Sequence, residues 1–165
     1  MASTKYLILI RGPPAVGKTA IGAKLVKVLP EPAIVLHQET IQYRLPSSGM
    51  INFKTLINAM VRNLLAQNAS IIIDGDYSGE AAKEQIDILA NIAKRNAAKF
   101  THVFIDAPLD TCLARNKDRS KKAPDEEIRK QYDSAHTSME TAEVIDSTKH
   151  TVDQIVAHIA NQLTK

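Results

Sequence analysis

The sequence has little of several residue types, and each shortage argues against a class of protein. It contains one cysteine, Cys112, so no disulfide can form within the chain. Its aromatic residues are three Phe and four Tyr with no Trp, which leaves few side chains on which nucleic-acid bases could stack. No apolar run approaches the roughly 20 residues of a membrane-spanning helix, and the first residues lack a charged-then-apolar signal pattern. We therefore expect a cytoplasmic protein without a membrane partner.

The length and charge of the chain set broad limits. A chain of 165 residues suits one domain, so residues 1–165 are expected to form a single unit. The 21 Lys and Arg residues exceed the 18 Asp and Glu residues by three, which is weak evidence for a nucleic-acid partner. These bulk properties do not determine the oligomeric state.

Short apolar runs alternate with segments of helical periodicity. The runs are rich in Ile and Val, as in strands covered on both faces, and they fall at residues 6–10, 33–36, 70–74, 102–106 and 144–145. Helical periodicity marks residues 20–29, which Pro30 and Pro32 are expected to end, and also residues 53–65, 86–93 and 152–163. This alternation predicts an α/β fold with a parallel sheet and helices on both faces.

A glycine-rich loop follows the first apolar run. Its sequence, Gly-Pro-Pro-Ala-Val-Gly-Lys-Thr, matches the phosphate-binding pattern G-x-x-x-x-G-K-[ST]. Backbone N–H groups of such a loop, with the positive end of the next helix, cradle a polyphosphate. Lys18 is predicted to neutralise the outer phosphates, and the Thr19 hydroxyl to bind Mg²⁺. The expected ATP-binding residues are Gly12, Pro13, Pro14, Ala15, Val16, Gly17, Lys18, Thr19 and Ala20, together with Arg115 and Arg119.

Acidic residues stand at or just after the ends of the other four apolar runs, at the edge of a parallel sheet where ligands gather. Asp74 comes directly after three isoleucines and is predicted to hold the metal near Thr19 through a water molecule, the alternative being a strand-end cap. Asp76 is expected either to meet the acceptor or to make an Asx-turn.

The second run ends in His37-Gln38-Glu39, just before a helix expected to begin near Thr40. Glu39 is predicted to be the general base that takes the proton from an acceptor hydroxyl. The alternative for Glu39 is an exposed residue in the first turn of that helix. His37 is expected to have a structural role rather than to touch the substrate.

The segment 115–122 has five cations in eight residues and leads into a helix expected to start at Pro124. It predicts a basic lid, at about 115–124, that closes over the nucleotide and excludes water. Arg115 and Arg119 would stabilise the negative charge of the transferred group, and on a continuing helix they would share one face. A solvated basic turn and a patch that binds polynucleotide phosphates are the alternatives.

Together these motifs resemble the small P-loop kinases of the AAA-type and zeta-toxin-like group, which includes the polynucleotide kinase domain, adenylylsulfate kinase and chloramphenicol phosphotransferase. The resemblance covers nearly the whole chain and includes residues 104–110, which lead to the lid arginines. It implies a three-layer P-loop NTPase fold with five strands in the order 2-3-1-4-5, a lid arginine over adenine, and an adenine pocket bordered by residues 146–149. The family often has Asp followed by Arg three residues on, where this chain has Glu39 and Gln42.

The sequence therefore predicts an ATP- and Mg²⁺-dependent phosphotransferase that moves the γ-phosphoryl group to a hydroxyl of a small-molecule acceptor. A kinase of nucleic-acid 5′-hydroxyl groups is an alternative that the few aromatic residues disfavour. A non-catalytic ATP-binding regulatory protein is another, although such proteins usually lose the metal carboxylate or the lid cations. A GTPase is disfavoured because the chain has no Asn-Lys-x-Asp motif.

Overall fold

The computed structural model describes residues 4–45, 52–75, 77–79, 81–137 and 142–163. Five parallel strands form its central sheet: β1 (Tyr6–Arg11), β2 (Ala33–His37), β3 (Ser70–Asp74), β4 (Lys99–Asp106) and β5 (Glu143–Asp146). They lie in the order β2-β3-β1-β4-β5, which confirms the order that the resemblance implied.

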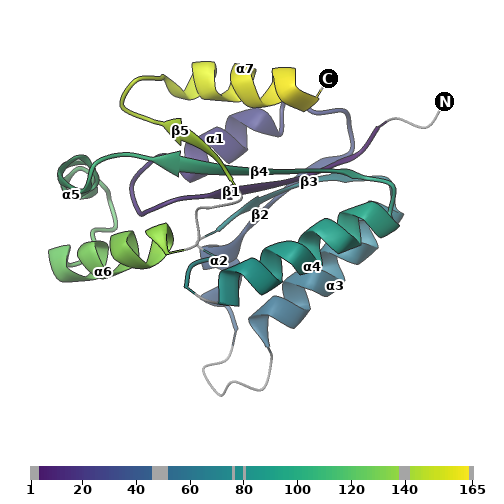
Figure 1. Cartoon of the computed structure of the whole chain (residues 1–165), viewed down its shortest axis with the longest axis horizontal. Helices are drawn as coiled ribbons and strands as arrows, with labels where there is room; N and C mark the ends of the chain where they lie inside the picture. Colours follow the sequence, from purple (N-terminus) through teal and green to yellow (C-terminus); the bar gives the residue numbers. More distant parts are fainter. Residues whose placement is uncertain (1–3, 46–51, 76, 80, 138–141, 164–165) are drawn as a thin grey trace.

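Helices cover both faces of the sheet, as Figure 1 shows. They are α1 (Lys18–Leu25), α2 (Gln38–Gln42), α3 (Phe53–Ala66), α4 (Ala81–Arg95), α5 (Leu109–Lys117), α6 (Asp125–His136) and α7 (Val152–Leu163). One face packs against α1 and α7, and the other against α3 and α4. Within the described ranges, no helix has both the length and the apolar character needed to cross a bilayer.

Two apolar cores meet at β1, whose six residues are all buried. Ile8 and Ile10 point into the core formed with α1 and α7, while Leu7 and Leu9 point into the core formed with α3 and α4. The alternation follows from the two-residue period of a strand, and the absence of a polar face explains why β1 reads as a continuous apolar run. The loop after β1 is therefore anchored at the centre of the molecule.

The first helix is shorter than the sequence predicts. It ends at Leu25 rather than near Leu29, and Val28, which the periodicity placed on its apolar face, is 57% exposed. Lys27 and Val28 instead donate their backbone N–H groups to carbonyls three residues back. Such tight bonds commonly end helices, and here they turn the chain toward the Pro30–Pro32 segment and β2. The second helix begins at Gln38, two residues before the expected position.

The first glycine of the loop meets a steric limit that makes it irreplaceable. Gly12 has φ of +140°, and a Cβ atom there would lie 1.9 Å from the carbonyl oxygen of Ile105 in β4. No side-chain rearrangement relieves a clash with backbone. With glycine at position 12, the loop can approach β4 more closely than it could with any other residue there.

We expect Gly12→Ala to lower the free energy of unfolding by at least about 2 kcal/mol, because it adds a backbone clash to a strained φ. Urea denaturation measures the loss. Gly79→Ala is the control: Gly79 also has a positive φ, of +77°, but a Cβ atom added there would have no neighbour within 4 Å, so about 1 kcal/mol is expected. Equal losses in the two variants would contradict the steric argument.

Candidate active site

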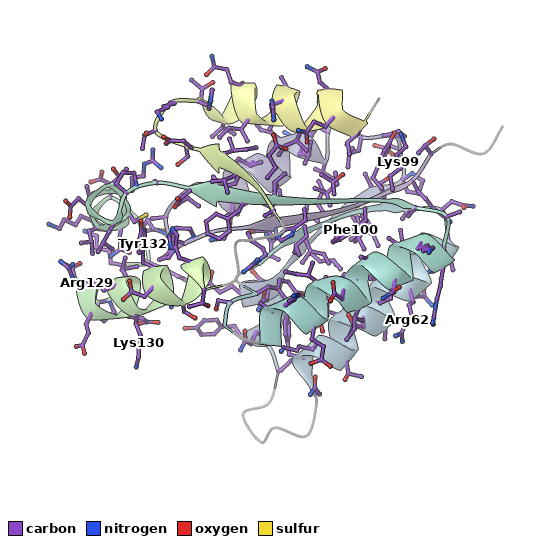
Figure 2. All side chains as sticks on the ribbon, in the orientation of Figure 1. Arg62, Lys99, Phe100, Arg129, Lys130 and Tyr132 are labelled. Atoms are coloured by element: carbon purple, nitrogen blue, oxygen red, sulfur yellow. The ribbon has the colours of Figure 1, made fainter. Side chains whose placement is uncertain are left out.

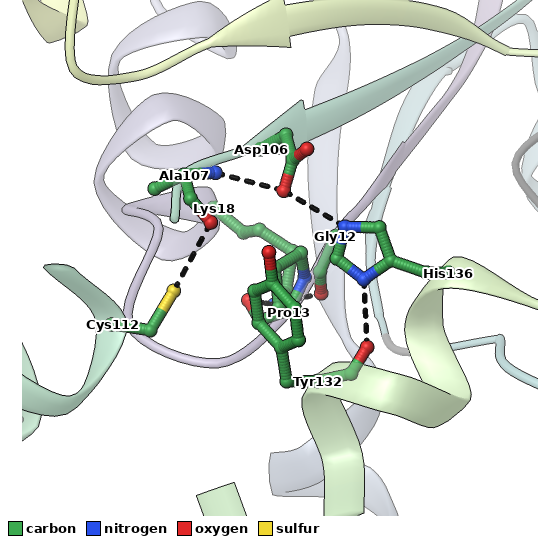
Figure 3. A network of polar contacts seen from close by, with 8 residues as sticks. All are labelled: Gly12, Pro13, Lys18, Asp106, Ala107, Cys112, Tyr132 and His136. Atoms are coloured by element: carbon green, nitrogen blue, oxygen red, sulfur yellow. Dashed lines mark hydrogen bonds and ion pairs between the residues drawn. The ribbon is translucent and has the colours of Figure 1, made fainter. Parts of the chain in front are cut away.

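The phosphate-binding loop is held in place by its own residues. Val16 is buried in the core beside α1, and Gly17, with φ of +97°, turns the chain into α1. The Lys18 Nζ donates to the carbonyl oxygens of Gly12, at 2.7 Å, and Pro13, at 2.8 Å. Figure 3 shows this lysine lying along the loop. Its ammonium group thus contacts loop carbonyls, with which phosphate oxygens would have to compete.

The structure brings Thr19 and Asp74 together. The Thr19 hydroxyl donates to Asp74 Oδ2 at 2.8 Å, and His37 Nδ1 lies 3.0 Å from the same oxygen. Strand register explains the cluster, because Asp74 lies opposite His37 on β2 and opposite Ile10 on β1. Only 7% of Asp74 is exposed, so the carboxylate sits beneath the start of α1 with two polar partners. His37 thus contacts Asp74, and its structural role stays a prediction.

These residues suit magnesium in combination with a nucleotide. In the part of the chain that the structure describes, no group of three or more His, Cys, Asp or Glu side chains could hold a metal by itself. Mg²⁺ commonly takes one or two protein oxygens, substrate phosphates and water. The hydroxyl of Thr19 and the carboxylate of Asp74, joined by one hydrogen bond, provide hard oxygen atoms of this kind. The metal roles of both residues stay a prediction.

Glu39 lies in the first turn of α2 and is exposed. Together with Gln42 and Tyr43 it lines a hollow of about 340 Å³. Tyr43 is 87% exposed, so its ring is available to a ligand. Because α2 follows β2 directly, Glu39 is carried to the same edge of the sheet as Asp74. Its role as a base stays a prediction, and Asp76 lies outside the described residues.

The segment 115–124, which is predicted to form a lid, begins inside a helix, because α5 continues through Lys117. Arg115 is therefore helical, and it donates from Nη1 to the Ser147 hydroxyl at 2.9 Å and from Nη2 to the Ser147 carbonyl at 3.0 Å. Arg119 lies beyond the end of the helix and is exposed. The two arginines consequently do not share one helical face. Arg115 fixes the segment after β5, and Arg119 belongs to the loop.

The segment after β5 is ordered by a compact turn. Asp146 Oδ1 accepts from the Thr148 hydroxyl at 2.6 Å and from the Thr148 backbone N–H at 2.8 Å. These hydrogen bonds from Thr148, with the nearby charge of Lys149, lower the pKa of Asp146 to about 2. The carboxylate is thus ionised over the physiological range. Residues 146–149, which the resemblance places beside adenine, are held by this turn and by Arg115.

Cys112 is a buried thiol without catalytic character. It is 0% exposed, and its Sγ lies 3.7 Å from the carbonyl oxygen of Ala107. Burial raises the pKa of the Cys112 thiol, and the negative charge of Asp106 adds to the rise. Since the thiolate is the reactive form of cysteine, this thiol packs as a small apolar side chain.

Sequence reasoning did not identify Asn116, whose side chain closes the basic loop. Asn116 is 2% exposed; its Nδ2 donates to the Ala123 carbonyl at 2.8 Å, and its Oδ1 accepts from the Ala123 N–H at 3.2 Å. These two bonds join the ends of the segment 117–122. No pattern signalled the contact, because an asparagine among cations is ordinary at a helix end.

We expect Asn116→Ala to lower the free energy of unfolding by about 1–3 kcal/mol, since it removes two hydrogen bonds from a buried site. The backbone N–H of Ala123 should exchange with solvent deuterium faster, which mass spectrometry or NMR would measure. Asn91→Ala is the control, because Asn91 is exposed and its side chain donates to the carbonyl of Asp87 in its own helix. Unchanged exchange at Ala123 would show that Asn116 does not close the loop.

A second cluster that the sequence did not reveal lies at the end of β4. Asp106 Oδ1 accepts from the backbone N–H of Ala107 at 2.8 Å and lies 3.1 Å from His136 Nε2. His136 Nδ1 lies 2.7 Å from the carbonyl oxygen of Tyr132, and the two rings are 4.3 Å apart. Burial, followed by the charge of Asp106, raises the pKa of the Tyr132 hydroxyl. Figure 3 shows this cluster beside the phosphate-binding loop.

A buried charge lies under the same loop. Arg11, the residue before Gly12, is 0% exposed, and its guanidinium carbon lies 5.8 Å from the centre of the Phe104 ring. Its Nη1 is 3.4 Å from His102 Nε2. Burial and, next, the charge of Arg11 lower the pKa of His102 to about 4, so this imidazole is neutral. The last residue of β1 is thus fixed by aromatic and imidazole contacts from β4.

Comparisons with known proteins agree with this geometry. A sequence profile of the AAA_33 family, described as an AAA domain, matches residues 7–141. An L-seryl-tRNA(Sec) kinase of Methanococcus maripaludis is 28% identical over 138 residues, which cover 79% of this chain and 52% of that protein. The L-seryl-tRNA(Sec) kinase of Mus musculus is 30% identical over 89 residues, covering 51% of this chain and 24% of that protein. The chain therefore spans about half of one relative and a quarter of the other.

A sugar kinase from Janibacter sp. HTCC2649 has the same fold. The two structures superpose with a TM-score of 0.70 over 97% of this chain and 95% of that chain, at 14% sequence identity. With the kinase relatives, this likeness confirms the resemblance to small P-loop kinases.

Proposed function

This chain is a member of the AAA_33 family, and from that membership and the site we propose that it is an ATP- and Mg²⁺-dependent phosphotransferase. The acceptor would be a hydroxyl group of a small molecule. The observation that carries the proposal is the 2.8 Å hydrogen bond between Thr19 and Asp74 beside an intact phosphate-binding loop. It joins the two side chains that a kinase of this class needs for its metal.

The donor side follows from the loop. Its backbone N–H groups and the start of α1 would hold the phosphates of ATP, and Lys18 would exchange two carbonyl partners for phosphate oxygens. That exchange is favourable because a hydrogen bond between two charged groups is stronger than one to a neutral carbonyl. When bound, Mg²⁺ would neutralise charge on the outer phosphates, held by Thr19 with Asp74 behind it. The exposed cations of the loop after α5 would exclude water.

The acceptor side is supported by the hollow on α2. Glu39 would accept the proton of the attacking hydroxyl, while Gln42 and Tyr43 would bind the rest of the molecule. None of these three lining residues is a cation. A site for a nucleic-acid backbone would be expected to present Lys or Arg to its phosphates, so this lining favours a neutral acceptor that carries hydroxyl groups.

A nucleic-acid hydroxyl is the second candidate for the acceptor. The basic loop at 117–122 and the tRNA kinase relatives favour it. If it is correct, labelled phosphate from ATP should appear in added tRNA or oligonucleotides, and binding should weaken steeply as salt is raised. Binding that does not respond to salt would exclude this candidate.

We expect Lys18→Ala to reduce the transfer of labelled phosphate from ATP to a pool of metabolites by about 100-fold or more, because it removes a charge that stabilises the transferred group. Chelation of Mg²⁺ should do the same. Lys24→Ala is the matched control, since Lys24 lies on the same helix but pairs with the exposed Asp153 at 2.7 Å. ATP binding without turnover of any acceptor would favour the regulatory protein instead.

We expect Glu39→Gln to lower kcat by about 100-fold or more while the KM for ATP changes little, because the amide keeps the shape of the side chain but cannot accept the proton. Glu31→Gln is the matched control, since Glu31 is an exposed glutamate that precedes β2, at the opposite edge of the sheet. Full acceptor-dependent turnover in Glu39→Gln would show that the assigned base is wrong.

A further inference from the structure

Helix α6 begins just after the basic loop, and its last residue, His136, contacts Asp106 at the end of β4. It continues from the loop after α5, and it lies with α5 at the carboxyl edge of the sheet (Figure 1). Its outer residues are exposed: Figure 2 shows Arg129 and Lys130 on α6, both pointing away from the sheet. Its inner face buries Ile128 and Ala135, and the Ser134 carbonyl accepts from the backbone N–H of Gly79 at 3.4 Å. The position of α6 therefore determines where one end of the basic loop lies.

The last residue of α6, His136, carries the ion pair with the sheet. Among the described residues, His136 and Asp106 form the salt bridge that joins α6 to a strand, with side chains 26% and 27% exposed. The Phe104 ring meets the imidazole edge-on, with centroids 5.4 Å apart. Tyr132 makes the other ring contact, at 4.3 Å. The imidazole is thus fixed in plane and position.

The two polar partners of His136 are both hydrogen-bond acceptors when Asp106 is ionised, because a carbonyl oxygen and a carboxylate can only accept. Both contacts are then hydrogen bonds only if both ring nitrogens carry hydrogen. In that form an imidazolium faces a carboxylate whose own position is fixed by the Ala107 N–H.

Building on the proposed phosphotransferase function, we propose that His136 is a positioning residue for ATP binding. Its pair with Asp106 holds α6, and with it the basic loop, at the edge where the phosphates bind. Neither ring nitrogen of His136 is directed at the nucleotide site, because both are taken up by Tyr132 and Asp106. Loss of the pair would let the loop open and weaken ATP binding, while the transfer step of the bound complex would change little.

The nucleotide-free protein gives the first test. Arg119, Lys121 and Lys122 are exposed cleavage sites for trypsin in the loop. We expect His136→Gln and Asp106→Asn each to increase the rate of cleavage there about tenfold, the factor that corresponds to loss of one charge-assisted hydrogen bond. His158→Gln is the matched control. His158 of α7 forms the same kind of pair with Glu143 of β5, at 2.7 Å, and this pair does not involve the basic loop or α6.

The kinetics of the active protein give the second test. Both variants should raise the KM for ATP about tenfold and leave kcat within about twofold. The double variant should resemble either single variant, because both remove the same contact. Thermal unfolding of each variant checks that it is folded. If His136→Gln does not fold, the test is made with Asp106→Asn alone.

Several outcomes would overturn the proposal. Cleavage and KM values like those of His158→Gln would show that packing alone holds α6. A fall in kcat with an unchanged KM would make His136 a catalytic residue, and additive effects in the double variant would show that the two residues act separately. If the wild-type protein neither binds ATP nor phosphorylates any acceptor, the proposed function fails, but the nucleotide-free cleavage experiment still decides whether His136 holds the loop.

Discussion

The pairing of β1 between β3 and β4 is the constraint on which the rest of the structure depends. Because β1 is buried on both faces and bonded along both edges, the loop that follows it has a fixed starting point. The same pairing places Asp74 next to the end of β1 and brings Phe104 beside Arg11. The Asp74 carboxylate and the contacts of Arg11 with β4 are therefore both positioned relative to the phosphate-binding loop by one strand.

Much of this arrangement could be predicted from the sequence. Strands buried on both faces produce apolar runs that are easily recognised, and the order of motifs resembles a known family with one sheet order. The meeting of Thr19 and Asp74 follows from that order, because one lies just beyond β1 and the other ends the neighbouring strand. What these residues bind in the protein stays a prediction.

Other features could not be predicted, for identifiable physical reasons. The contact between His136 and Asp106 spans 30 residues and exists only because α6 folds back onto β4. Asn116 closes a loop through side-chain bonds to backbone, which leave no periodic signal. The predicted end of α1 is wrong because helical periodicity continues through Val28, although the chain has already tightened into turns. Tertiary packing and local backbone geometry decided each case.

A phosphate anion in the loop would have to compete with the two hydrogen bonds that Lys18 makes with Gly12 and Pro13. An inorganic phosphate ion and a nucleoside triphosphate would both offer Lys18 charged oxygens in place of the two neutral carbonyls. Only the longer anion would also engage the whole row of loop N–H groups at once. The number of N–H contacts, rather than the lysine, would therefore favour a nucleotide over a small anion.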